Sequence, residues 1–205
     1  MKILVSCFEP FAGDAVNSAQ EAVARLPKRL GGAEIAAVVL PVVFGASGDK
    51  LLEAIGRERP DAVISVGQAG GAAAIRVERV AVNLDDARIP DNAGAQPEDR
   101  PIVPGGPAAY FATLPVKRMV RAVRDAGAEA EVSNSAGTFV CNHVFYRAMH
   151  AAAGTRVRAG FVHVPFIPEQ TQNRPDAASM PLETISRALE AAIAAVTEND
   201  EISTN

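Results

Sequence analysis

Short apolar segments rich in β-branched residues alternate with amphipathic segments along most of the chain, and this alternation limits the folds that it can adopt. A strand that is apolar throughout must be buried on both faces, as in a parallel sheet covered by helices. The expected strands are residues 2–6, 34–43, 61–67, 75–83, 130–133 and 157–165. The expected helices are residues 18–26, 47–57 (after a serine N-cap), 115–126, 138–153 and 181–197. The pattern therefore predicts an α/β fold with a mostly parallel sheet.

A single domain over residues 1–205 is the expected organisation, because no linker or internal repeat divides the sequence and single α/β domains often have this length. Two segments depart from the alternation. Residues 85–107 are rich in Pro, Gly and Asp and longer than an ordinary connection, which predicts a lid or a contact arm, or else disorder. Residues from about 196 to 205 are expected to be a frayed tail.

Composition excludes several classes of protein. A net charge of −4 argues against a general nucleic-acid binder. Two cysteines and three histidines are too few for a disulfide scaffold or a zinc module, so no metal is expected. No apolar run reaches the roughly 20 residues of a membrane span, and the first apolar run meets Glu9 too early for a secretory signal. We therefore expect a cytoplasmic protein with free thiols at Cys7 and Cys141.

Cys141 is the strongest candidate for a nucleophile. It follows Ala136-Gly137-Thr138, which predicts a turn and a hydroxyl N-cap, so Cys141 falls in the first turn of the helix. Unpaired N–H groups and the helix dipole stabilise a thiolate at that position. The alternative is that Cys141 is a small buried apolar residue, which is the more frequent role of a free cysteine.

Two polar residues interrupt strands that are otherwise apolar. His163 lies near the end of the last expected strand, and a buried imidazole there needs a partner. Glu78 lies within residues 75–83 and must also be paired, either with Arg76 or Arg79 as an ion pair or with His163. If Glu78 faces His163, the two residues and Cys141 form a nucleophile–base–orienter set. His143 and His150 are interpreted as structural or exposed, since no third ligand has metal-site spacing.

Other catalytic motifs are absent from the sequence. It contains no G-x-S-x-G, H-E-x-x-H or Walker A sequence. The run Gly67-Gln68-Ala69-Gly70-Gly71 follows a strand but lacks G-x-G-x-x-G spacing, so a dinucleotide cofactor is not indicated.

Five sequence blocks in order resemble the pyroglutamyl peptidase I (pyrrolidone-carboxylate peptidase) family of cysteine peptidases. They are FEPFAGDAVN (8–17), GQAGG (67–71), ERVAVNLDDARIPDNAG (78–94), SNSAGTFVCNHVFY (133–146) and GFVHVPFIPEQ (160–170). The resemblance spans nearly the whole chain. It implies a three-layer α/β/α sandwich with a mixed sheet, a homotetramer, no cofactor and peptides with an N-terminal pyroglutamate as substrates.

Carried over by position, the resemblance also implies the roles of individual residues. The family's catalytic cysteine, histidine and glutamate fall on Cys141, His163 and Glu78. The pocket for the lactam ring falls on Phe8, Phe11, Gln68, Ile89, Phe139 and Val140. A residue suggested to assist the oxyanion falls on Arg88.

The chain departs from the family pattern at a few positions, and these departures bear on affinity more than on mechanism. They are Cys7 and Ala12 in place of glycines, Arg76 in place of Ser or Thr, Val42 in place of Thr, and Ala72 in place of Arg. Two alternatives to the peptidase remain at this stage. One is a non-catalytic binder of pyroglutamyl N-termini or free lactams, and the other is a nucleoside-processing enzyme, which would need a phosphate-binding loop that the sequence lacks.

Overall fold

A seven-stranded sheet lies at the centre of the protein in the computed structural model, which describes residues 1–198. Its strands are β1 (Lys2–Phe8), β2 (Arg29–Leu30), β3 (Ala33–Leu40), β4 (Ala62–Gln68), β5 (Ile75–Glu78), β8 (Ala130–Ser133) and β9 (Arg158–Val164). Their order across the sheet is β2-β3-β1-β4-β9-β5-β8. The pairs from β3 to β9 are parallel, whereas β5 runs antiparallel to β9 and parallel to β8.

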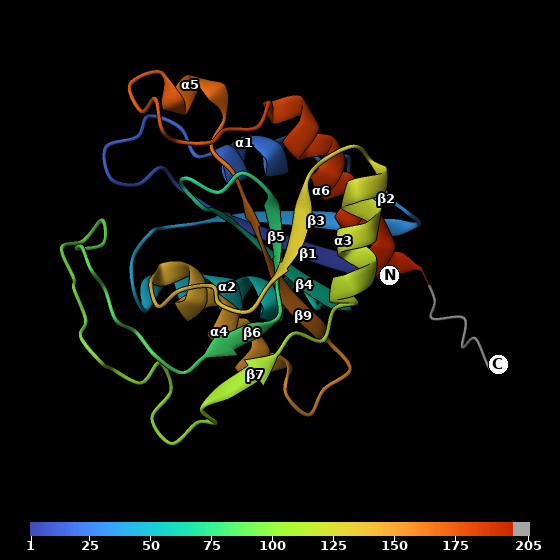
Figure 1. Cartoon of the computed structure of the whole chain (residues 1–205). Helices are drawn as coiled ribbons and strands as arrows, with labels where there is room; N and C mark the ends of the chain where they lie inside the picture. Colours follow the sequence, from blue (N-terminus) through green and yellow to red (C-terminus); the bar gives the residue numbers. More distant parts are fainter. Residues whose placement is uncertain (199–205) are drawn as a thin grey trace.

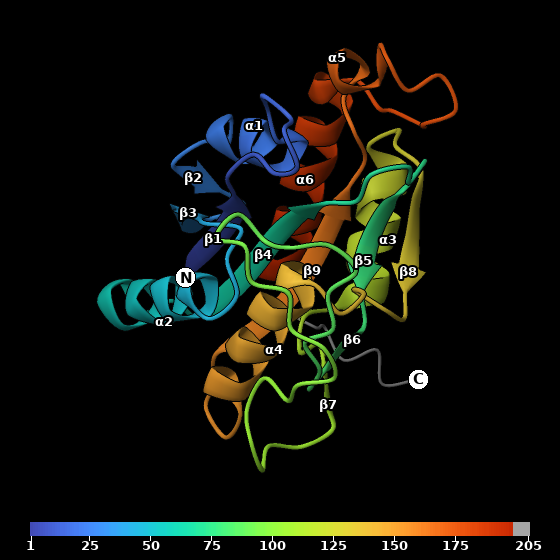
Figure 2. The same cartoon turned by 90° about the vertical axis from the view of Figure 1, so that its left-hand side faces the viewer.

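Helices cover both faces of this sheet (Figure 1; Figure 2). They are α1 (Ser18–Ala24), α2 (Ala46–Glu58), α3 (Val116–Asp125), α4 (Val140–Ala152), α5 (Pro168–Thr171) and α6 (Leu182–Thr197). Helices α2 and α4 pack against one face, and α1, α3 and α6 contribute to the core on the other. The three-layer α/β/α arrangement with a mostly parallel, mixed sheet confirms the expected fold class.

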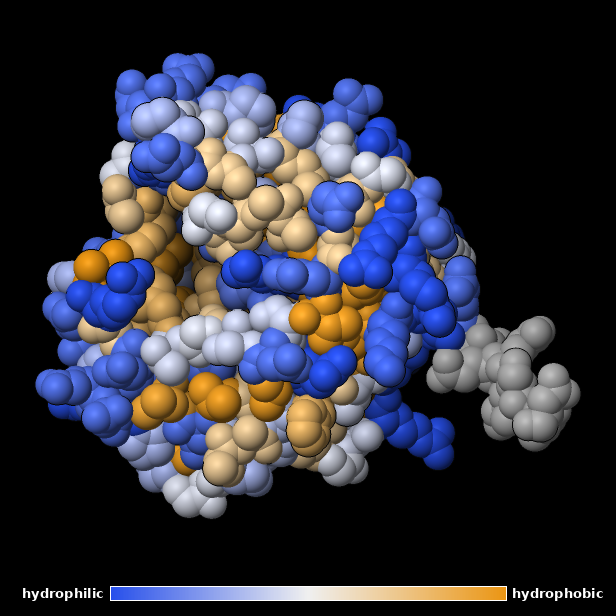
Figure 3. Space-filling view, in the orientation of Figure 1, coloured by the Kyte–Doolittle hydropathy of each residue, from blue (hydrophilic) through white to orange (hydrophobic). Residues whose placement is uncertain are grey.

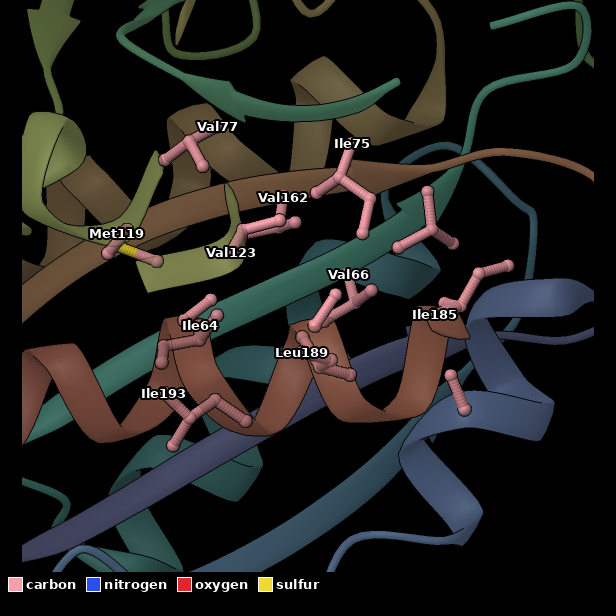
Figure 4. Packing of buried hydrophobic residues seen from close by; sticks show 14 of the residues in the cluster. Ile64, Val66, Ile75, Val77, Met119, Val123, Val162, Ile185, Leu189 and Ile193 are labelled. Carbon is pink, nitrogen blue, oxygen red and sulfur yellow. The ribbon is translucent and has the colours of Figure 1, made fainter. Parts of the chain in front are cut away.

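The alternating directions of side chains along each strand divide the apolar core into two clusters. On the α6 side, Ile64 and Val66 of β4 and Val162 of β9 pack against Leu189 and Ile193 of α6 (Figure 4). On the opposite face, Leu4, Val63 and Phe161 pack against residues of α2 and α4. The strands are therefore apolar throughout because both of their faces are covered.

The strand predicted over residues 75–83 is wrong in one respect, because the chain leaves the main sheet at Arg79. Strand β6 (Val80–Val82) instead pairs with β7 (Ala109–Phe111) in a two-stranded sheet. The backbone of Arg79 joins the two sheets, since its N–H donates to Ser133 O and its carbonyl accepts from Ala112 N. This break is a tertiary effect, because the apolar pattern of the sequence runs straight through it.

Two helix boundaries also differ from the prediction. Helix α2 begins at Ala46, after Gly45 with φ 72°, and has no side-chain cap; the serine at position 47 lies inside the helix. Helix α6 includes Val196 and Thr197, and Val196 is fully buried, so the predicted fraying is wrong there. The rest of that predicted tail, residues 199–205, lies outside the described residues.

Residues 85–107 form an irregular arm (green, left of Figure 1). An isolated antiparallel β-bridge joins the backbones of Asp85 and Arg100 within it. Among the helices that the structure describes, none is long and apolar enough to cross a membrane.

Candidate active site

Cys141 lies in the first turn of α4, one residue after the helix begins at Val140. No carbonyl within residues 1–198 accepts a hydrogen bond from the backbone N–H of Cys141, as expected for the first turn of a helix. The thiol is half-buried and lies against Gly67 at the end of β4. A methyl group at Gly67 would approach Sγ of Cys141 to 2.9 Å. The sulfur therefore occupies the space that this glycine leaves open.

The predicted hydroxyl N-cap of this helix is wrong, because Thr138 is engaged elsewhere. The N-cap is Phe139, whose side chain makes no capping bond. The Thr138 hydroxyl donates instead to Asp86 O at 2.7 Å, and the Asp86 N–H donates to Thr138 O at 3.0 Å. Gly137 does make the predicted turn, with φ 73°. The arm thus binds Thr138 and leaves the N-terminal N–H groups of α4 without a side-chain acceptor.

Glu78 and His163 face each other across the antiparallel pair β5–β9. His163 Nδ1 lies 2.8 Å from Glu78 Oε1, and both side chains are buried. Arg76 does not compete, because its Nε donates to Glu131 Oε1 at 2.8 Å on the neighbouring strand. Arg79 donates to Asn134. Of the two pairings that the sequence left open for Glu78, the structure therefore contains the one with His163.

The charge on His163 follows from its neighbours. Burial lowers the pKa of His163, but hydrogen bonds to Cys141 and to Glu78, together with the negative charge of both groups, outweigh burial and raise the pKa to about 9. The imidazole is therefore protonated at neutral pH. A protonated imidazole between a sulfur and a carboxylate is the arrangement that keeps a cysteine in its nucleophilic thiolate form.

A cavity of about 580 Å³ opens beside Cys141 and His163. It lies on the side of the molecule that Figure 3 shows hollowed at the left, where apolar side chains line the depth of the hollow. The residues predicted for the substrate pocket all line it, together with the predicted oxyanion residue: Phe8, Phe11, Gln68, Ile89, Phe139, Val140 and Arg88. The structure thus brings every predicted site residue except the buried Glu78 to one cavity.

Three aromatic side chains, Phe8, Phe11 and Phe139, are among the residues that line this cavity. The ring centroids of Phe11 and Phe139 are 5.1 Å apart, and Phe44 meets Phe139 edge-on at 5.2 Å. Ile89, on the arm, is 46% exposed at the rim. Apolar surface in and around a cavity favours a flat, uncharged ligand, because such a ligand loses little hydration on entering.

The side chain of Gln68 offers one defined hydrogen-bond donor to the cavity. Its Oε1 accepts from the N–H of Ser18 at 2.9 Å. Because a backbone N–H can only donate, the amide oxygen must face Ser18 and the amide nitrogen must point away. No acceptor within the described chain bonds this Nε2, and Gln68 lines the cavity. The nitrogen is therefore available to a ligand oxygen.

The loop of residues 9–17, which carries Phe11, is closed by its own last residue. Asn17 Oδ1 caps α1, accepting from the N–H of Ala19, while Nδ2 donates to Glu9 O at 3.1 Å. Ala12, one of the departures from the family pattern, has φ 54°. That left-handed conformation suits the glycine expected at this position and costs an alanine roughly 1 kcal/mol. The loop therefore keeps the turn despite the substitution.

The remaining cysteine and histidines lie outside the cavity, as predicted. Burial raises the pKa of the Cys7 thiol to about 12, which makes it unreactive. His143 is buried and its Nδ1 lies 2.8 Å from Asp85 Oδ2, whereas His150 is exposed and bonds Tyr110. No group of His, Cys, Asp and Glu within residues 1–198 has the arrangement of a metal site.

Some residues that line the cavity were not predicted as binding residues: Asn17, Val42, Gly70, Asp86, Ala136, Gly137 and Thr138. Most of them belong to the sequence blocks that carry the resemblance, but they reach the cavity through their backbone or through loop geometry. Asn17 had a recognisable signal, because an Asn directly before an amphipathic run is a typical N-cap. Val42 lies outside the blocks, but the family resemblance implied a pocket-wall residue at its position. The others had no signal beyond their position in the blocks.

Comparisons with known proteins agree with one another. The family model described as pyroglutamyl peptidase matches residues 1–199. The pyrrolidone-carboxylate peptidase of Erwinia tasmaniensis is 55% identical over 193 residues, which is 94% of this chain and 91% of that protein. The enzyme of the same name from Finegoldia magna is 54% identical and covers 98% of this chain and 95% of its own.

Solved structures give the same result. The crystal structure of Bacillus amyloliquefaciens pyroglutamyl peptidase I has a TM-score of 0.92 and 46% identity, and covers 96% of each chain. A mutant pyrrolidone carboxyl peptidase from Pyrococcus furiosus has a TM-score of 0.92 and 43% identity, and covers 96% of this chain and 98% of that one.

Proposed function

The chain belongs to the pyroglutamyl peptidase family, and we propose that it uses Cys141, His163 and Glu78 to remove an N-terminal pyroglutamyl residue from peptides. The enzyme is a cysteine-type omega-peptidase. One observation carries the assignment of residues: His163 is buried between Glu78 and Cys141 beside a cavity with aromatic walls. That combination supplies a nucleophile, a proton carrier, an orienting carboxylate and a place for the lactam ring.

The reaction begins with attack of the Cys141 sulfur on the carbonyl carbon that joins pyroglutamate to the next residue. His163, whose pKa is about 9, takes the thiol proton. The carbonyl oxygen becomes an oxyanion, and the unpaired N–H of Cys141 is placed at the helix N-terminus to stabilise it. Arg88 lines the same cavity and is proposed to assist from the exposed side.

His163 then gives its proton to the amine of the departing peptide, and the C–N bond breaks. The pyroglutamyl group remains bound to Cys141 as a thioester. Water, deprotonated by the now neutral His163, adds to this thioester and releases free pyroglutamate and the thiolate. Glu78 stays ionised, holds Nδ1–H of His163 in place and stabilises the imidazolium.

The cavity explains the preference for a lactam. Phe11 and Phe139 are placed to enclose the flat ring, and Nε2 of Gln68 is placed to donate to its carbonyl. An N-terminal glutamate would bring an ammonium and a carboxylate into apolar surroundings without partners. A proline would leave the donor of Gln68 unpaired. Both should therefore be poor substrates.

Hydrolysis of three chromogenic amides, pyroglutamyl, glutamyl and prolyl, tests this function. We expect turnover of the pyroglutamyl amide only, with discrimination of about 10³-fold or more. Cys141→Ala should abolish turnover, and iodoacetamide should inactivate the parent by alkylating Cys141. Cys7→Ala is the matched control, because its buried thiol has no role in the reaction. Equal hydrolysis of all three amides, or an active Cys141→Ala variant, would contradict the proposal.

We also infer that the enzyme acts in the cytoplasm as a homotetramer on peptides, without nucleic acid. Both cysteines are free, which suits a reducing compartment. Phe111, the last residue of β7, is 73% exposed, and a large exposed aromatic side chain favours a contact with another chain. Light scattering coupled to gel filtration would measure the mass, and a monomer at micromolar concentration would contradict the tetramer.

A further inference from the structure

The segment that follows β9 turns back and contacts the loop of residues 9–17. Gln170, in α5, is the central residue of this contact. Its Nε2 donates to Gln68 Oε1 at 2.8 Å and lies 3.2 Å from Val16 O and 3.4 Å from an oxygen of Asp14. Its Oε1 accepts from the N–H of Ile167 at 3.1 Å. One side chain thus joins β4, the loop and the segment after β9.

The direction of both amides in this contact is fixed by backbone donors. The Ile167 N–H can only donate, so the oxygen of Gln170 must face it and the nitrogen must face Gln68. Gln68 in turn receives bonds at its oxygen from Ser18 and from Gln170, which directs its own nitrogen away from both. Gln170 therefore acts together with Ser18 to fix the direction in which Gln68 offers its donor to the cavity.

A second contact lies four residues further along the same segment, at Arg174. The guanidinium of Arg174 binds the carboxylate of Asp14 through two nitrogens, at 2.5 and 3.3 Å. The same guanidinium lies over the ring of Phe166, 5.0 Å from its centroid. Phe166 itself packs against Gly70, which lines the cavity. Arg174 thus holds the loop at Asp14, in addition to the closure of its two ends by Asn17.

We propose that Gln170 and Arg174 are positioning residues for the lactam site, holding the amide of Gln68 and the loop of Phe11 in the arrangement that binds the ring. Neither residue lines the cavity or touches the reacting atoms. Their effect therefore falls on the affinity for the lactam and leaves the chemistry of Cys141 and His163 unchanged. This inference rests on the proposed function, because it assigns the same cavity to the lactam ring.

The variant Gln170→Glu tests the hydrogen-bond donor of the Gln170 side chain separately from its acceptor. Glutamate keeps the length of the side chain and the acceptor for the Ile167 N–H, but it cannot donate to Gln68 or Val16. We expect KM for a pyroglutamyl amide to rise about tenfold, since at least one hydrogen bond in the network is replaced by a pair of facing acceptors. We expect kcat to change by less than about threefold, and the rate of alkylation of Cys141 by iodoacetamide to remain at the parental value.

Gln172→Glu is the matched control. Gln172 lies two residues further on the same segment and is exposed, and its side chain makes no hydrogen bond within residues 1–198. The Gln172→Glu variant carries the same change of charge as Gln170→Glu, and its KM should equal that of the parent. A second control is the Gln68→Ala background. If Gln170 acts through the amide of Gln68, Gln170→Glu should raise KM much less there than in the parent.

Arg174→Gln is the second variant, and it keeps the proposal testable if Gln170→Glu folds poorly. It removes the ion pair with Asp14 and should also raise KM without slowing alkylation of Cys141. A parental KM in both variants would overturn the inference while leaving the proposed function intact. Equal losses in kcat and in the alkylation rate would also overturn it, because they would place the effect on the chemistry. Lack of turnover by the parent enzyme would instead contradict the proposed function.

Discussion

At the scale of single residues, the charge state of His163 decides what the site can do. The imidazole is buried, which by itself would keep it neutral, yet two negatively charged neighbours raise its pKa to about 9. Glu78 is 1% exposed, and its Oε2 has no partner within the described residues. A buried carboxylate with so few partners depends on the imidazolium, just as the imidazolium depends on it.

Glu78→Gln should lower kcat/KM, though less than His163→Ala does. The amide can present an N–H to Nδ1 of His163, which favours the wrong tautomer. Loss of the negative charge also lowers the pKa of His163, because Glu78 raises it in the parent. The alkaline limb of kcat/KM, near pH 9 in the parent, should therefore move to lower pH. A pH profile from 6 to 10 measures both effects.

Glu131→Gln is the control for this change. Glu131 lies on the neighbouring strand and pairs with Arg76, not with His163. Its pH profile should match that of the parent. A folded Glu78→Gln enzyme with parental kcat/KM and an unmoved alkaline limb would remove Glu78 from the catalytic set.

At the scale of elements, the site forms where the end of β4 meets the beginning of α4. Two side chains of α4 fix the helix to β6 and to the beginning of the arm. Asn142 bonds the backbone of Val82 and Leu84, and His143 bonds Asp85. These contacts set the position of the first turn of α4, and Gly67 of β4 leaves room for the sulfur. The close approach of strand and helix thus requires a residue without a side chain.

Gly67→Ala should reduce kcat/KM by about 10²-fold or more. The added methyl group would lie 2.9 Å from Sγ of Cys141 and 2.8 Å from the ring of Phe161, so the sulfur must shift. A displacement of roughly 1 Å at a reacting atom commonly costs that much. Steady-state kinetics and the iodoacetamide alkylation rate would both detect the shift.

Gly56→Ala is the control for this substitution. Gly56 is exposed within α2 and has no atom within 4 Å of the added methyl group, so activity should be unchanged and stability equal or slightly higher. Parental kcat/KM in Gly67→Ala would show that the sulfur does not need the space beside this glycine.

At the scale of the whole molecule, the sheet separates the site from much of the core. Phe161 and His163 point to the α4 side of β9, while Val162 and Val164 point to the α6 side. Helix α6 therefore stabilises the fold through buried side chains such as Ile193 and Leu189 (Figure 4). It contributes no residue to the lining of the cavity.

Ile193→Ala should lower the free energy of unfolding by about 2–5 kcal/mol, because it leaves a cavity in a fully buried cluster. The value of kcat/KM at 25 °C should stay at the parental value while the protein remains folded. Urea denaturation and steady-state kinetics on the same sample measure the two quantities. A loss of kcat/KM in fully folded protein would show that the two faces of the sheet are coupled.

The sequence by itself determined the fold class and most of the site. The apolar strands and amphipathic helices have local signals, and the residues Cys141, His163 and Glu78 lie in sequence blocks that the family resemblance locates directly. The existence of a buried strand or an amphipathic helix depends largely on residues close in the sequence, so it can be predicted without knowing the rest of the structure, whereas the exact ends of several elements differed.

Only the tertiary structure decided which partner each polar group takes. Whether Glu78 pairs with Arg76 or His163 depends on β9 lying beside β5 in antiparallel direction, and no local pattern encodes that pairing. The predicted cap by Thr138 does not form for the same reason. Its hydroxyl donates to the carbonyl of Asp86, in the arm, which is distant in the sequence. Gln170 bonds Gln68 across 102 positions of the chain. Hydrogen bonds are short and directional, so they depend on the final positions of elements that the sequence brings together only on folding.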